Sequence, residues 1–277
     1  MEIIGAAVAF IVGTAGGSFL NVCIYRLPRG MSIITPRSHC FHCDTELGTA
    51  DLVPLLSYLW LRGLCRYCGV RISGRYFLVE LVTGLAFAAL YLHHRGAIFD
   101  FVSAALFAGV LIPVFFIDLE YTLIPAELTA AGMLIGVGSD LLKLLVGQGQ
   151  PLEWLVPGTT WLIQIPASLV GLCLGGAVFA SIVVLGRVLF GREAMGGGDV
   201  HLAAAIGAKL GPGYAFLTFF LLAVGLGALI GVLLIALRLR SRQDYIPFGP
   251  FMVVSAFLLL FWGEALTRLI RQCYPWP

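Results

Sequence analysis

The stretch MEIIGAAVAFIVGTAGGSFLNVCIY, residues 1–25, decides the class of fold. It contains a single charged residue, Glu2. A helix of this length, rising about 1.5 Å per residue, can cross the roughly 30 Å hydrocarbon layer of a bilayer. The stretch lacks a basic start and an A-x-A cleavage motif, so we expect a retained transmembrane helix and not a removed signal peptide.

The rest of the chain has the same apolar character. Of its 277 residues, 60% are hydrophobic and only 12% are charged, which is more apolar sequence than a soluble core needs. The candidate membrane spans are residues 3–25, 76–92, 98–117, 127–147, 166–190, 199–212, 213–237 and 250–271. The sixth is short, and a GPG sequence separates it from the seventh. The sequence therefore predicts an all-α polytopic membrane protein with about eight transmembrane helices.

One long polar insertion, residues 26–75, lies between the first two spans. It carries seven arginines and only three acidic residues. The positive-inside rule places this loop in the cytoplasm and the N-terminus outside. With eight spans, the loops on that side also include 118–125, 187–198 and 238–247, and together the four hold 12 of the 17 basic residues.

Four cysteines in this loop form the pairs CFHC (Cys40, Cys43) and CRYC (Cys65, Cys68), with 21 residues between them. Each pair has the spacing that suits tetrahedral zinc ligation. Two disulfides or four free thiols are the alternatives, and a cytoplasmic location argues against disulfides. The two histidines beside the first pair could replace one thiolate. A loop of this size builds only a small core, so bound zinc would contribute to its folding.

Two carboxylates fall at the same depth of the predicted bilayer. Asp118 lies in FFIDLEYTLIPAEL at the end of the third span, and Asp199 lies in AMGGGDVHLAAAIGAKLG at the start of the sixth. An ionisable group at the membrane boundary is costly, which makes it a candidate functional residue. The alternative is that each residue only ends a helix: Asp199 as an N-terminal cap and Asp118 as a solvated loop residue.

Three features favour a functional pair. Gly196, Gly197 and Gly198 leave room for another backbone to approach. Pro125 suits the start of a helix soon after Asp118. The segment after Asp199 is rich in alanine and glycine, as a tightly packed membrane helix is. Two adjacent carboxylates cannot both ionise cheaply, so the pair could hold and activate a water, as aspartic proteases do. We assign the shared proton to neither residue.

The sequence resembles the type IV prepilin peptidases, which belong to the GxGD class of intramembrane aspartic proteases. The motif GGGD matches the family's GxGD, and FIDLEYTLIP matches its second aspartate segment. Further matches are GSFLNVCIYRLP (17–28), VPLLSYLWLRGLCRYCGVRISGRYFLVELVTG (53–84) and IPFGPFM (246–252). The chain departs from the commoner family pattern at Ala126, Glu120 and His201, none of which is a proposed catalytic residue.

The resemblance implies that Asp118 and Asp199 are catalytic, with the three glycines forming the active-site loop. It implies cleavage of leaders from prepilins or type II secretion pseudopilins at the cytoplasmic face of the bacterial inner membrane. Methylation of the new N-terminus with S-adenosylmethionine would follow. The implied domains are a first helix (1–25), a zinc-binding, methyltransferase-associated domain (26–75) and a transmembrane peptidase domain (76–277). The four cysteines fit the family's zinc-binding domain.

The sequence is also compatible with other functions. The same acids could serve a proton- or ion-coupled transporter, and the zinc loop could dock a partner of a non-enzymatic assembly factor. Membrane lipid is an expected partner, and no nucleic acid is. No Rossmann-type glycine turn indicates where the methyl donor binds. Glu80 could pair with Arg71 or Arg75, or contact the donor or the substrate's new N-terminus.

Overall fold

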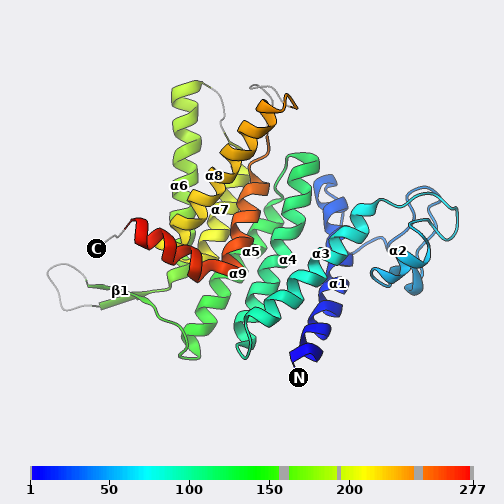
Figure 1. Cartoon of the computed structure of the whole chain (residues 1–277), viewed down its shortest axis with the longest axis horizontal. Coiled ribbons are helices and arrows are strands. Elements are labelled where there is room, and N and C mark those ends of the chain that lie inside the picture. The colour runs from blue at the N-terminus through cyan, green and yellow to red at the C-terminus, as the bar shows by residue number, and fades with distance from the viewer. Residues whose placement is uncertain (1, 156–161, 192–194, 240–245, 275–277) are drawn as a thin grey trace. The chain divides into compact units, whose positions relative to one another are not determined.

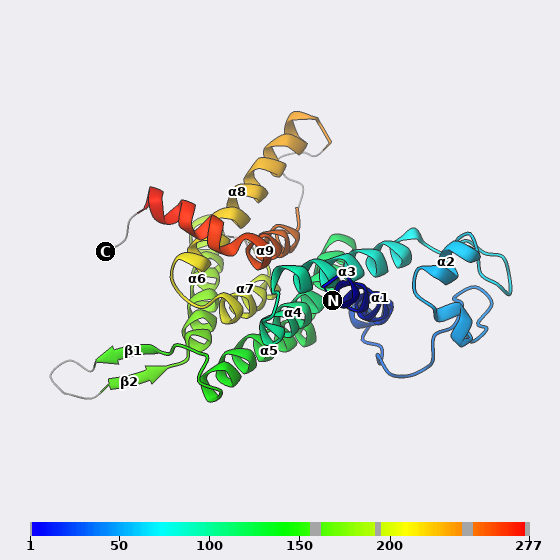
Figure 2. The ribbon, with the colours of Figure 1, turned by 60° about the horizontal axis from the view of Figure 1, so that its bottom comes forward.

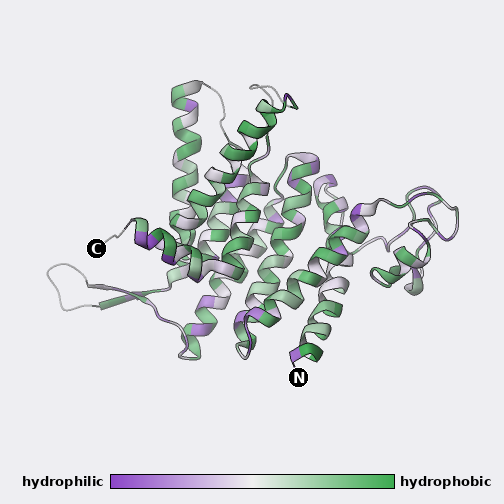
Figure 3. Ribbon diagram, viewed as in Figure 1, coloured by the Kyte–Doolittle hydropathy of each residue, from purple (hydrophilic) through white to green (hydrophobic). Residues whose placement is uncertain are grey.

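The computed structural model describes residues 2–155, 162–191, 195–239 and 246–274 (Figure 1). Every predicted span is helical. The helices are α1 (Glu2–Arg26), α3 (Gly74–His93), α4 (Ile98–Tyr121), α5 (Ala126–Leu145), α6 (Ala167–Phe190), α7 (Gly197–Leu210), α8 (Tyr214–Ala236) and α9 (Gly249–Cys273). All of these except α7 are long and apolar enough to cross a membrane, giving seven candidate spans among the described residues. Figure 3 shows the long helices as largely hydrophobic along their lengths. The prediction of a helical polytopic membrane protein is confirmed.

Helix α7 differs from the expected sixth span. It has 14 residues and is therefore about 21 Å long, too short to cross the bilayer by itself. The chain leaves it through Gly211 and Gly213, whose φ angles of 71° and 96° suit glycine and no other residue well. Residues 202–208 are all buried, so α7 is packed inside its unit and does not face lipid over that stretch.

A β-hairpin is the second difference. Strands β1 (Leu152–Leu155) and β2 (Leu162–Ile165) pair antiparallel between α5 and α6, as Figure 2 shows. Each strand is only four residues long, and neither gives a strong periodic signal in the sequence. The fold is therefore mostly helical and not strictly all-α.

The chain divides into two compact units, Met1–Ile117 and Asp118–Pro277. In the first unit, α1 and α3 lie side by side (Figure 1). Their backbones approach closely because glycines lie at the contact. A Cβ on Gly13 would come within 2.8 Å of the Thr83 carbonyl oxygen, and one on Gly17 within 2.7 Å of the Glu80 Cα. The loop between these helices contains the short elements η1 (Leu27–Arg29), η2 (Thr49–Leu52) and α2 (Leu56–Trp60).

In the second unit, α7 packs against α5 and α6. In Figure 1, α5 and α7 run from the upper to the lower end of this unit, and α6 and α8 run in the opposite direction. Glycines again permit the close contact. A Cβ on Gly207 would overlap the Gly171 carbonyl oxygen of α6, and one on Gly136 of α5 would come within 2.9 Å of Ala208. This packing holds the start of α7, and therefore Asp199, in a defined place.

Candidate active site

Asp118 lies in the last turn of α4 and is 4% exposed. The Thr122 N–H donates to its backbone carbonyl (2.9 Å), and Thr122 adopts a φ of 50°, which turns the chain out of the helix. Pro125 then precedes the first residue of α5, where its fixed φ favours helix initiation. The sequence predicted this helix start correctly. Asp118 is thus a buried residue at a tight helix–turn–helix connection, not a solvated loop residue.

Asp199 lies in the first turn of α7 and is also 4% exposed. The Gly196 N–H donates to its Oδ2 (3.2 Å), so the carboxylate does satisfy one free N–H group of its own helix. The capping residue itself is Gly196, not Asp199. Asp199 therefore does help to cap its own helix, as the alternative expected. This hydrogen bond uses only one of its two carboxylate oxygens.

The two aspartates come together through Gly198. A Cβ at this position would lie 2.9 Å from the Ile124 Cβ and 3.4 Å from the Ile124 carbonyl oxygen. The start of α7 therefore packs directly on the turn that follows Asp118. The carboxylates of Asp118 and Asp199 are close enough to interact electrostatically. By contrast, a Cβ on Gly197 would meet nothing within 4 Å, which leaves open space beside the pair among the described residues.

A third segment, the first turn of α9, completes this site. A Cβ on Gly249 would overlap the Asp118 Oδ2, so the Gly249 backbone lies directly against the carboxylate. Asp118 Oδ2 is buried and has no hydrogen-bond partner within the described part of the chain. The sequence analysis did not assign Gly249 to the site. The segment IPFGPFM, which contains Gly249 and matches the family, was the one feature of the sequence that pointed to it. An oxygen in this position can accept a hydrogen bond from a bound water or substrate.

The four predicted metal ligands also come together, within the first unit. Their sulfur atoms all lie within 4.8 Å of one another, and Cys40 Sγ and Cys68 Sγ are 3.8 Å apart. Four sulfurs at roughly 2.3 Å from a tetrahedral zinc ion are separated by roughly 3.8 Å. All seven cysteines of the chain are unpaired, so the disulfide alternative is wrong in this structure. The histidines beside the first pair are not part of the cluster of ligand atoms.

Both cysteine pairs are held in turns of the same kind. The Cys40 N–H donates to the Thr45 carbonyl (2.9 Å), and the Cys65 N–H donates to the Val70 carbonyl (2.8 Å). Asp51 joins the two halves of the loop. It accepts hydrogen bonds from Arg66 Nε (2.6 Å), the Tyr67 hydroxyl (3.0 Å) and the Gly48 N–H (3.1 Å). These contacts hold the second pair beside the first.

The electrostatics of the cluster favour a cation. Hydrogen bonds from the Thr45 side chain and backbone lower the pKa of Cys43 to about 6. The Val70 backbone acts to lower the pKa of Cys68, but desolvation and the three neighbouring sulfurs raise it to about 12. The Cys43 thiol therefore loses its proton readily, whereas the Cys68 thiol keeps its proton, because adjacent thiolates repel each other. A metal ion that binds all four sulfurs would stabilise all four thiolates.

Comparison with known proteins adds an independent finding. The family models for the Bacterial Peptidase A24 N-terminal domain and the Type IV leader peptidase family match residues 11–94 and 105–232. A prepilin leader peptidase/N-methyltransferase of Aeromonas hydrophila is 34% identical over 95% of this chain and 92% of its own length. Proteins of the same name from Myxococcus xanthus and Pseudomonas aeruginosa are 38% and 28% identical, over 83% and 95% of this chain and 63% and 92% of theirs. No solved structure matches the chain.

Proposed function

Because the chain belongs to the type IV leader peptidase family, we propose that Asp118 and Asp199 are the catalytic pair with which it cleaves leader peptides. As a member of this family the protein is an enzyme, a prepilin leader peptidase and N-methyltransferase, and its substrates are prepilins. S-Adenosylmethionine is the methyl donor that the second activity uses. The protein is integral to the inner membrane. Transport by the same acids finds no support in its relatives.

The observation that carries the assignment of the pair is its geometry. Two nearly buried carboxylates lie at the end of α4 and the start of α7, and Gly198, next to Asp199, packs directly on Ile124 of the turn that follows Asp118. In the proposed reaction, one carboxylate is ionised and takes a proton from water as the oxygen attacks the scissile carbonyl. The other carboxyl donates its proton to the leaving amine as the C–N bond breaks. The predicted active-site loop Gly196–Gly198 is the capping residue and the first two residues of α7, and the proposed substrate lies extended beside it.

Substitution of each aspartate tests this assignment. We expect Asp118→Asn and Asp199→Asn to abolish cleavage of a prepilin peptide with glycine before the cut, while Glu127→Gln, an exposed carboxyl at the start of α5, leaves cleavage unchanged. Mass spectrometry reads the leaderless product, and the added mass of one methyl group reports the second activity. Near-normal cleavage by either Asp→Asn variant would exclude that residue from the pair.

The metal centre is proposed to be a structural zinc site. Four thiolate donors with tetrahedral spacing suit zinc and leave no ligand position open for a reactive water. We further propose that residues 1–25 form a first helix, residues 26–75 a zinc-binding loop domain and residues 76–277 the peptidase domain. Pseudopilins of type II secretion are proposed as substrates beside prepilins.

The orientation is likewise proposed. The basic residues favour a cytoplasmic loop 26–75, an external N-terminus and an active site at the cytoplasmic face. Lipid is the proposed surrounding of the exposed apolar side chains on the long helices, among them Leu134, Leu145, Val188 and Leu229.

A further inference from the structure

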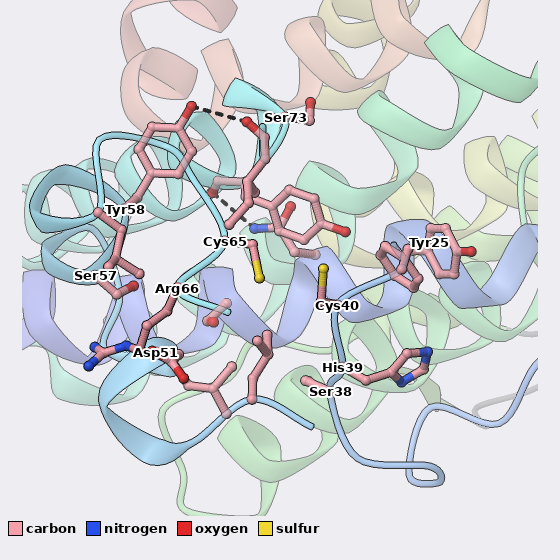
Figure 4. A pocket seen from close by; sticks show the side chains of 18 of the residues that line it. Tyr25, Ser38, His39, Cys40, Asp51, Ser57, Tyr58, Cys65, Arg66 and Ser73 are labelled. Carbon is pink, nitrogen blue, oxygen red and sulfur yellow. Dashed lines mark hydrogen bonds and ion pairs between the residues drawn. The ribbon is translucent and has the colours of Figure 1, made fainter. Parts of the chain in front are cut away.

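The first unit contains a cavity that the peptidase site does not use. Its volume is about 410 Å³, within the range of about 300–1,000 Å³ that suits a small organic ligand. The walls come from the end of α1, the start of α3 and the cysteine loop. Figure 4 shows two of the cluster sulfurs, those of Cys40 and Cys65, turned toward each other beside it. The cavity is therefore built partly from the metal centre.

Two buried polar residues, Asn21 and Glu80, are among those that line this cavity. Asn21 is 2% exposed and donates from Nδ2 to the Tyr76 carbonyl (3.0 Å), while its Oδ1 has no hydrogen-bond partner among the described residues. Glu80 is 8% exposed and accepts the Leu55 N–H at Oε2 (2.8 Å). The expected pairing of Glu80 with an arginine is wrong, because its contacts in the described chain are neutral donors.

An ionised carboxylate that is buried without a cation beside it is costly, so the group either keeps its proton or pairs with a ligand that carries a positive charge. A primary ammonium carries such a charge and brings three N–H donors. Glu80 can accept one of them, and a small rotation of the Asn21 side chain would let its unpartnered Oδ1 accept another. The remaining walls include several aromatic rings. Tyr25 and Phe41 stack with their centroids 4.2 Å apart, and both line the cavity, as does Tyr58. Aromatic faces suit a purine ring and a sulfonium cation.

We propose that this cavity binds the methyl donor, and that Asn21 and Glu80 form a binding site for a primary ammonium group within it. This inference rests on the proposed function, since it assigns a place to its methyl-transfer step. In that step the N-terminal amine, having lost a proton, attacks the methyl carbon of the sulfonium. The N–C bond forms, the C–S bond breaks, and its electron pair stays on sulfur, giving a methylated amine and a thioether.

Two reactants carry the ammonium that this binding site recognises: the amino-acid end of the donor and the new N-terminus of the cleaved substrate. If the substrate's amine binds there, Glu80 also accepts the proton that this amine must lose. Binding of S-adenosylhomocysteine and the KM for a synthetic leaderless peptide distinguish these two cases.

The experiment uses the full chain in detergent with its metal bound. Glu80→Gln keeps the acceptor for the Leu55 N–H but removes the charge. Ser57→Phe fills the cavity from the loop, and Leu56→Phe, at a neighbouring exposed position outside the lining, is its matched control. Metal content and leader cleavage report folding in every variant. Dissociation constants come from equilibrium dialysis with labelled S-adenosylhomocysteine, and methylation is followed by mass spectrometry.

We expect Ser57→Phe to weaken S-adenosylhomocysteine binding at least about tenfold and Leu56→Phe to leave it unchanged. Glu80→Gln should raise either that dissociation constant or the KM for the leaderless peptide about tenfold, because a charge-assisted hydrogen bond is lost. If the wild type methylates and both cavity variants bind and methylate like it, the inference is overturned while the proposed function stands. A wild type that cleaves but never methylates would instead remove the proposed second activity.

Discussion

Gly249→Ala is the sharpest test of the active site, because the change is one methyl group in a position that has no room for it. The added Cβ would overlap Asp118 Oδ2 and lie 3.2 Å from the Ile124 Cδ1. Real Cβ atoms essentially never come within 3.0 Å of another heavy atom, so the carboxylate or the start of α9 must move. The required shift is at least about half an ångström. The φ of Gly249 is not left-handed, so the backbone itself accepts alanine.

Such a shift should reduce leader cleavage strongly and stability little. A displacement of about 1 Å in a catalytic group can slow a reaction about 100-fold, which is about 2.7 kcal/mol in activation free energy. A glycine-to-alanine change in a helix alters stability by only about 1 kcal/mol. The assay compares cleavage rates for a prepilin peptide, with methylation of a leaderless peptide as the second readout.

Gly263→Ala is the matched control, since it lies on the same helix and a Cβ there would meet no atom of the described residues within 4 Å. We expect cleavage by this variant to equal that of the wild type. If Gly249→Ala cleaves within about threefold of the wild type and is equally well folded, then Asp118 does not act from the position described, and the reasoning about the pair is refuted.

Three further outcomes are expected. Chelation of the metal should abolish methyl transfer at concentrations that leave leader cleavage intact, because Cys40 and Cys65 line the donor cavity; both activities and metal content are measured together. Gly207→Val should lower the stability of the second unit by about 3 kcal/mol, seen as a lower melting temperature, since its side chain would overlap the Gly171 carbonyl. Partial burial acts to raise the pKa of Asp51, but its hydrogen bonds lower it, so its contribution to the loop is complete at neutral pH and lost as the pH falls below about 4. Hydrogen exchange in residues 48–67 should therefore be about tenfold faster in Asp51→Asn at pH 7, and the difference between the two proteins should shrink as the pH falls below about 4.

The close approach of helices explains several of the glycines in this chain. Between α1 and α3, and between α6 and α7, glycines allow backbones to meet where a side chain would overlap a carbonyl oxygen or a Cα. Among the described residues around the aspartates, Gly198 and Gly249 are needed for packing, whereas a Cβ on Gly197 would meet no described atom within 4 Å. Glycine therefore serves two purposes here, and sequence alone does not separate them.

Some features could be read from the sequence because their signals are local. A continuous apolar run identifies a membrane helix, since its transfer into lipid depends on its own side chains. The two C-x2-C pairs identify a candidate metal centre for the same reason, because two residues between cysteines fix the reach of their sulfurs. Pro125 and the GPG sequence predicted helix ends through their own backbone preferences.

The sequence by itself thus determined the membrane class, the helices, the four candidate metal ligands and the two candidate aspartates. Only the tertiary structure decided that α7 is a short buried helix, that Gly249 lies against Asp118, and that Asn21 and Glu80 share a cavity with two metal ligands. Gly249 and Asp118 are separated by more than a hundred residues. Their contact depends on how whole helices pack, and no preference of either residue for its own conformation contains that information.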